Sequence, residues 1–173
     1  MSLPRFRYNP DSISSFQAAR GKCRRCGVRR ELEYIGPQYG LDEVDHLCGD
    51  CIADGSAAKT FDLEFTDSDG PEPGPDARNL DELLHRTPGY LGPEGDRWPV
   101  HCSDYCAHLG RVFWRDLSPL LSELEPDISA FCEETTMDLD ELEAEVERDR
   151  SPLLVHLFRC LVCGRHRLVA GYE

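Results

Sequence analysis

Cysteine placement constrains the fold of this chain more than any other feature of its sequence. Eight of the nine cysteines fall into close pairs, and only Cys132 stands alone. A single CxxC pair can mark a metal site, a redox pair or a coincidence, so the four pairs have to be considered together. In chain order they are Cys23 and Cys26, Cys48 and Cys51, Cys102 and Cys106, and Cys160 and Cys163.

The surrounding composition argues against a disulfide framework. No apolar run approaches the length of about 18 residues that a membrane span needs, and the first twenty residues lack the apolar core of a signal peptide. We therefore expect a cytoplasmic protein, in which thiols are kept reduced. With 173 residues and 40% hydrophobic content, the chain can fold as one domain or as two small lobes.

Charge is distributed unevenly along the chain. The formal net charge is −14, yet residues 1–30 hold eight basic residues against one acid, Asp11. The rest of the chain carries 32 acids against 11 bases. Nucleic acid and anionic membranes should be repelled, except by the basic region. A basic protein is the expected partner, and the sequence contains no evident small-molecule site.

The first two cysteine pairs have the spacing of a four-cysteine zinc site. Twenty-one residues separate Cys26 from Cys48, and two CxxC turns deliver four thiolates to tetrahedral corners. Gly27 follows the first pair, where a knuckle turn needs a residue that tolerates positive φ. We expect two short strands around a Gly-Pro turn, then a short helix beginning near Cys48, whose dipole favours thiolate. This order is treble-clef-like, and a zinc ribbon is the alternative.

The last two pairs, Cys102 with Cys106 and Cys160 with Cys163, predict a second zinc site. The second of these pairs again precedes a glycine, and the flanking apolar alternation predicts a hairpin. If Cys102 and Cys106 lie on a helix, their spacing of four places both sulfurs on one face.

Other side chains compete for that second site. His101 is an alternative ligand and His108 is a further competitor, while Gly110 is the expected end of the helix. Without a metal, these residues would form a buried thiol pair beside a single CxxC. Cys132 is expected to be a buried apolar thiol.

The predicted fold class is α+β. Residues 1–66 form the N-terminal zinc module, and residues 67–79 form an acidic connector rich in proline and glycine. Residues 80–173 form a mainly helical lobe that a zinc-knuckle hairpin closes. Within this lobe we expect helices near residues 80–85, from Ser118 with Pro119 in the first turn, and over residues 137–150. The last helix places Leu139, Leu142 and Val146 on one face.

With these motifs in order, the chain resembles the CbrC family of bacterial proteins. The resemblance spans nearly the whole chain and runs through LPRFRYNPD, CRRCG, YIGPQYG, LCGDCIADGSAAKTFDLEFTD, RTPGYLG, WPVHCSDYCAHLG and FRCLVCGRHRL. It implies that the cysteine pairs are the framework of the fold. It also implies an association with colicin tolerance, and it supplies no catalytic residues.

The sequence therefore predicts a non-enzymatic protein with two zinc ions per chain. Residues 123–149 contain twelve acids and one base, Arg148, which form either a solvated face or a recognition surface for a basic partner in a tolerance or immunity-like role. One alternative is a zinc-finger contact with nucleic acid. A second is a zinc hydrolase that uses His101, although HExxH, P-loop, GxSxG and deaminase motifs are missing. The nucleic-acid contact would use Arg24, Arg25, Arg29 and Arg30.

Overall fold

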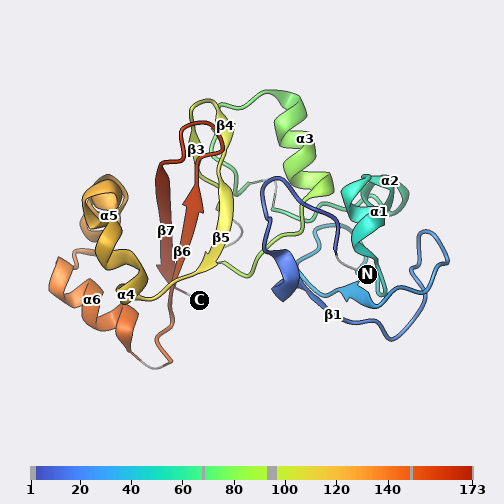
Figure 1. Cartoon of the computed structure of the whole chain (residues 1–173), viewed down its shortest axis with the longest axis horizontal. Coiled ribbons are helices and arrows are strands. Elements are labelled where there is room, and N and C mark those ends of the chain that lie inside the picture. The colour runs from blue at the N-terminus through green and yellow to red at the C-terminus, as the bar shows by residue number, and fades with distance from the viewer. Residues whose placement is uncertain (1–2, 68, 93–96, 149, 173) are drawn as a thin grey trace.

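Short helices and small antiparallel sheets alternate along the chain (Figure 1). The computed structural model describes residues 3–67, 69–92, 97–148 and 150–172. The first residues of the predicted zinc module, one connector residue and Asp149 of the acidic run lie outside this set. The predicted α+β class is confirmed, whereas the assignment to a treble clef or a zinc ribbon stays a prediction.

The N-terminal lobe combines one small sheet with two short helices. Buried aromatic and aliphatic side chains from residues 6–65, including Phe16, Leu47 and Phe65, form its core. The sequence predicted one strand before the Gly-Pro turn and one after it. The described residues contain the first of these, β2, but no strand directly after the turn, where Tyr39 forms only an isolated bridge with Glu64. Its elements are η1 (Ser12–Ser15), β1 (Phe16–Ala18) antiparallel to β2 (Leu32–Tyr34), α1 (Gly49–Ala53) and α2 (Ser56–Phe61).

Helix α3 (Ala77–Arg86) confirms the helix expected near residues 80–85 and begins within the predicted connector. Asp76 caps it by accepting hydrogen bonds from the backbone N–H groups of Arg78 and Asn79. Its buried Leu83 packs into a second core together with Trp98 and Tyr105.

The C-terminal lobe is a three-stranded sheet covered on one face by helices (Figure 1). The sheet order is β5-β6-β7, and helix α5 packs against β7 while α6 packs against β6. Leu142 and Val146 of α6 are buried as predicted, but Leu139 is 46% exposed. The elements are α4 (Trp114–Leu117), η2 (Ser118–Leu120), α5 (Leu121–Thr135), α6 (Leu139–Glu147), β5 (Ala107–Arg111), β6 (Leu153–Arg159) and β7 (His166–Tyr172).

The predicted helix over residues 102–110 is wrong. The segment forms a tight hairpin of β3 (Val100–His101) and β4 (Asp104–Tyr105), followed by β5. Cys102 and Ser103 have φ values of 52° and 60°, which reverse the chain and cannot continue a right-handed helix. Gly110 is part of β5, beside a register shift, and does not end a helix. Ser118 likewise lies in a short 3-10 turn with Pro119 and does not cap the long helix.

The N-terminal segment ties the two lobes together. The carbonyl of Tyr8 accepts a hydrogen bond from the backbone N–H of His108 at 2.8 Å, and its hydroxyl donates to Asp104 at 2.8 Å. Arg7 also pairs with Asp104. The Asn9 side chain donates to the carbonyl of Pro88 at 2.9 Å. Contacts made by the first few residues therefore hold the β3–β4 hairpin in place.

Among the described helices, none combines the length and the apolar character that a membrane span requires.

Candidate metal centres

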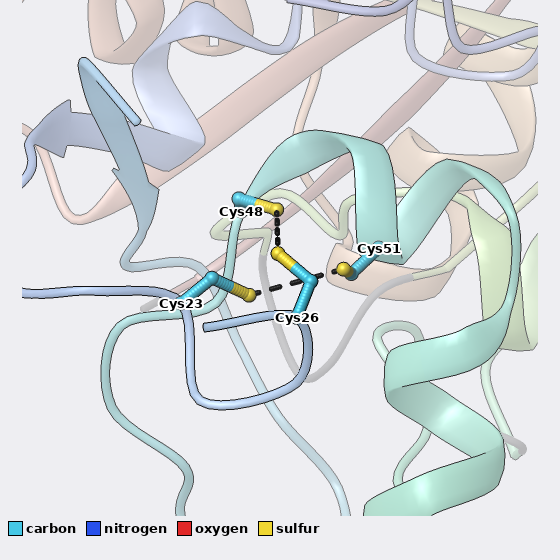
Figure 2. Close-up of side chains that lie close together, drawn as sticks. All are labelled: Cys23, Cys26, Cys48 and Cys51. Carbon is cyan, nitrogen blue, oxygen red and sulfur yellow. Dashed lines mark hydrogen bonds between the residues drawn. The ribbon is translucent and has the colours of Figure 1, made fainter. Parts of the chain in front are cut away.

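The first cluster brings together all four cysteines that the sequence assigned to it, Cys23, Cys26, Cys48 and Cys51. Figure 2 shows the four side chains pointing toward one another, two from a loop and two from the start of α1. The Cys23 and Cys51 sulfurs are 3.8 Å apart, and the Cys26 and Cys48 sulfurs are 4.0 Å apart. All four sulfurs lie within 4.8 Å of one another. This arrangement could hold a metal ion.

Helix α1 positions the second half of this cluster as the sequence predicts. Cys48 is its N-cap residue in extended conformation, and Cys51 lies one turn further on. The helix ends early because Gly55, with φ of 74°, separates α1 from α2. A half-buried pair braces the approach to the helix: the ring of His46 lies 2.6 Å from the carboxylate of the buried Glu33.

The second cluster contains one histidine and three cysteines: His101, Cys102, Cys160 and Cys163. Their ligand atoms also lie within 4.8 Å of one another. The Nδ1 atom of His101 is 3.3 Å from the sulfur of Cys102 and 3.3 Å from that of Cys163. The β3–β4 turn supplies two of these residues and the β6–β7 knuckle supplies the other two, so two hairpin ends meet at this point.

Cys106 does not join this cluster, and His101 takes the place that the sequence assigned to it. The Cys106 side chain is 0% exposed and packs in the core beside Trp98, whose Nε1–H donates to the Cys106 carbonyl at 2.7 Å. Burial raises the pKa of the Cys106 thiol to about 12. The hairpin turn separates Cys102 from Cys106, which a helix would have placed side by side.

The two CxxC turns are near copies of each other. In each turn the first cysteine donates its N–H to the carbonyl five residues later, and the following glycine donates back to that cysteine. Gly27 and Gly164 have φ values of 71° and 78°, which confirms the predicted positive φ after each pair. The four bonds are Cys23 to Val28 at 3.0 Å, Gly27 to Cys23 at 2.8 Å, Cys160 to Arg165 at 2.8 Å and Gly164 to Cys160 at 3.1 Å.

These turns also favour thiolate at the first cysteine of each. Burial raises the pKa of Cys23, but backbone N–H groups in the cluster lower it on balance to about 7. Burial raises the pKa of Cys160 too, and the N–H groups of Cys163 and Val162 lower it to about 6. Oriented amides thus stabilise the charge that a cationic metal would require.

The clusters differ in their access to solvent. In the first, only Cys26 is exposed and the other three sulfurs are buried. In the second, Cys102 and Cys163 are both exposed and His101 is half-buried. The first cluster is therefore part of a core, whereas the second lies at the surface where two hairpins meet.

The remaining candidate residues lie elsewhere. His108 is buried and contacts His156, with 2.9 Å between their ring nitrogens, and burial lowers the pKa of both rings, to about 3 and about 4. Cys132 is half-buried against the core under α5. In the basic region, Arg30 forms an ion pair with Asp50 at 2.8 Å.

Together, the fold and these clusters define a small α+β protein with two cysteine-rich sets of side chains that could each hold a metal ion. Residues 3–171 match the profile of a family described as uncharacterised protein family UPF0167. The chain belongs to this family.

Curated relatives of the same name support this membership. The UPF0167 protein Mb2317 of Mycobacterium bovis is 36% identical over 179 residues, which cover 98% of this chain and 94% of the relative. The UPF0167 protein PA1536 of Pseudomonas aeruginosa is 38% identical over 127 residues, which cover 70% of each chain. No solved structure matches the chain. The expectation of an uncharacterised, cysteine-rich family is confirmed, and the matched names do not include CbrC.

Proposed function

We propose that this protein binds two structural zinc ions and presents an acidic surface to a basic protein partner. The spacing of the ligand atoms supports zinc. Four thiolates at about 2.3 Å from a tetrahedral zinc ion stand about 3.8 Å apart, close to the 3.8 Å and 4.0 Å in the first cluster. Thiolate and imidazole are also the ligands that zinc prefers over harder cations.

Both clusters fit structural sites better than catalytic ones. A catalytic zinc keeps one coordination position open for water or substrate, whereas four protein ligands close the tetrahedron. His101 would be the fourth ligand of the second site, and this role leaves it unavailable as a catalytic base. The hydrolase alternative would require one of these ligands to leave the metal.

The observation that carries the partner proposal is a set of unpaired acids on α5 and α6. Several acids of the run have structural duties: Glu123 accepts hydrogen bonds from His166, and Asp127 accepts them from Arg167. Asp138 and Glu141 form the capping box of α6. Four exposed acids have no partner among the described residues and form what we call the acidic face: Glu133, Glu134, Asp140 and Glu143.

Complementary charge on a partner would raise its association rate and select it over other proteins. The resemblance to the CbrC family makes a tolerance or immunity-like role in the cytoplasm the most specific form of this proposal. In that role the acidic face would engage a basic toxin or nuclease. The basic residues of the N-terminal lobe are the second candidate surface, because Arg24 and Arg29 are exposed and their guanidinium groups have no carboxylate partner among the described residues.

The acidic-face proposal can be tested by capture and native mass spectrometry at low salt. The wild type is compared with a variant that carries Glu133→Gln, Glu134→Gln, Asp140→Asn and Glu143→Gln. The control removes four exposed acids of the N-terminal lobe, with Asp11→Asn, Asp42→Asn, Glu43→Gln and Asp45→Asn, and so changes the net charge equally.

We expect the wild type and the control to retain a basic protein that the acidic-face variant loses. Equal retention by all three proteins would refute the proposal. Capture of nucleic acid, lost steeply with salt and abolished by Arg24→Gln with Arg29→Gln, would favour the N-terminal surface instead.

A further inference from the structure

One corner of the C-terminal lobe carries a cluster of arginines, although the net charge of the protein is negative. The end of β5, the start of α4, the end of α6 and the loop before β6 meet there (Figure 1). They border an open pocket of about 750 Å³, a volume suited to a small ligand. Only eleven basic residues follow Arg30 in the sequence, and four of them line this pocket: Arg111, Arg115, Arg148 and Arg150.

Two of these guanidinium groups have no carboxylate partner. Arg148 is bound to Glu145 at 2.9 Å, and Arg115 has Asp116 at 3.9 Å. Among the described residues, no carboxylate lies within ion-pair distance of Arg111 or Arg150, although both belong to a chain with 14 more negative than positive charges. Two guanidinium groups without a carboxylate partner among the described residues line this pocket together with Glu147, and such a pair favours an anion with several oxygen atoms, such as a phosphate.

The same pocket offers an aromatic surface. Phe113 is 44% exposed, although it could have been buried like its neighbour Trp114. The guanidinium carbons of Arg111 and Arg115 lie over its ring, at 5.9 Å and 5.5 Å from the centroid. An exposed ring held between arginines is a surface on which a planar ring such as a nucleobase stacks.

Backbone conformation adds a further indication. Arg150 has φ of 60°, a left-handed conformation that is uncommon for residues other than glycine and asparagine. Such strain persists where the surroundings require it, often at ligand sites. Here it keeps an unpaired cation at the rim of the pocket, close to the chain reversal before β6.

We propose that this arginine–Phe113 pocket binds a small ligand that combines a planar ring with a phosphate group, such as a mononucleotide. A nucleic acid strand fits less well, because a polyanion must also approach the acids of α6 and the charge of −14. The pocket lies at the opposite end of β6 from Cys160, seven strand residues or about 23 Å away. It is therefore separate from the second cluster, and its lining shares no residue with the first.

The test is isothermal titration of the full-length protein with AMP, GMP and UMP, alongside adenosine, ribose 5-phosphate and inorganic phosphate. We expect saturable binding of at least one nucleotide, with binding at least about tenfold weaker for the fragments that lack the ring or the phosphate. Arg111→Gln and Arg150→Asn should each weaken nucleotide binding about tenfold or more. Asparagine is chosen because it tolerates the left-handed conformation.

Two further variants complete the design. Phe113→Leu should reduce the preference for nucleotide over ribose 5-phosphate about tenfold, while Lys59→Gln, which removes an exposed cation from the other lobe, should leave binding unchanged. Metal content and the circular dichroism spectrum verify the fold of each variant. The proposal is overturned if no nucleotide binds at millimolar concentration, or if the combined Arg111→Gln, Arg150→Asn variant binds normally. Tighter binding of a single-stranded oligonucleotide than of any mononucleotide would also overturn it.

Discussion

Replacing His101 and Cys106 separately gives the sharpest test of the second metal centre. The sequence spacing assigned Cys106 to this centre, whereas the structure brings His101 to it. We predict that Cys106→Ala retains two metal ions per chain and that His101→Ala retains one firmly. His85→Ala, which removes a histidine remote from both clusters, is the matched control.

The two substitutions should change different quantities: Cys106→Ala should lower stability alone, whereas His101→Ala should lower the affinity for zinc. Cys106 is 0% exposed, so its loss removes one buried sulfur and should lower the free energy of unfolding by about 1 kcal/mol. In a chain of this size, that change lowers Tm by about 2–4 °C. A structural zinc site contributes about 10–16 kcal/mol from four ligands, so removal of one ligand costs about 3 kcal/mol. The affinity of the second centre for zinc should then fall about 100-fold.

The assay is zinc stoichiometry by native mass spectrometry, followed by titration with a chelator of known affinity. Thermal unfolding of each variant, with and without excess zinc, reports stability. Excess zinc should restore most of the Tm lost in His101→Ala and none of that lost in Cys106→Ala. If Cys106→Ala lost one zinc ion while His101→Ala kept both firmly, the geometric assignment would be refuted.

Three other outcomes are expected. A chelator should remove one metal ion first, from the more exposed second cluster. Alkylation mapping should then find Cys102, Cys160 and Cys163 modified before the cysteines of the first cluster. The reverse order would contradict the role given to exposure. Burial lowers the pKa of His108 and His156 to about 3 and 4. Below about pH 6.5 these two rings take up protons in the unfolded chain but not in the folded chain. The free energy of unfolding should therefore fall with falling pH, by up to about 1.4 kcal/mol per pH unit for each ring. Denaturant unfolding between pH 7 and 5 should show a flatter profile for His108→Gln with His156→Gln, and an unchanged slope would show that these rings do not cause it. At Gly27 and Gly164 an added Cβ would meet no neighbouring atom, but the backbone at both positions has a positive φ. Alanine at either position should therefore cost about 1–2 kcal/mol of stability and asparagine less, with metal content unchanged. Loss of metal from the alanine variants would mean that the turns tolerate no adjustment.

Local chemistry explains why the first cluster could be predicted from the sequence. Cys23 and Cys26 lie in one turn whose shape Gly27 determines, and Cys48 with Cys51 lies in another. Each half of the cluster is thus encoded within a few residues, and only one loop closure separates the halves. Spacing and turn chemistry together predicted the four side chains that meet in this cluster.

The second cluster depended on information that spacing does not carry. A separation of four residues predicted a helix through Cys102 and Cys106, but the chain reverses at Cys102 and Ser103. The reversal follows from packing further along, because Tyr105 and Cys106 are required in the core beside Trp98. The adjacency of His101 and Cys102, with a knuckle elsewhere in the chain, was the available signal for the four side chains that meet in the structure.

The acidic run shows the same limit. Its composition predicted a charged surface, and the structure divides it into acids that serve the fold and acids that face solvent. Asp127, for example, binds Arg167 and the N–H of Leu168 across from β7. No pattern within residues 123–149 distinguishes this acid from Glu133, because its partner is 40 residues away in the sequence.

The bridge formed by Tyr8 and Asn9 has a consequence for the order of events during synthesis. All four cysteines of the first cluster have been translated by residue 51, so this cluster can assemble early. Asn9 and His108, however, contact each other across 99 residues. At about 5–20 residues per second, the N-terminal segment waits roughly 5–20 s for this partner. During that interval Tyr8, which is fully buried in the finished protein, is exposed. A nascent chain arrested before residue 108 should therefore present this aromatic residue to chaperones even when its first cysteine cluster has assembled.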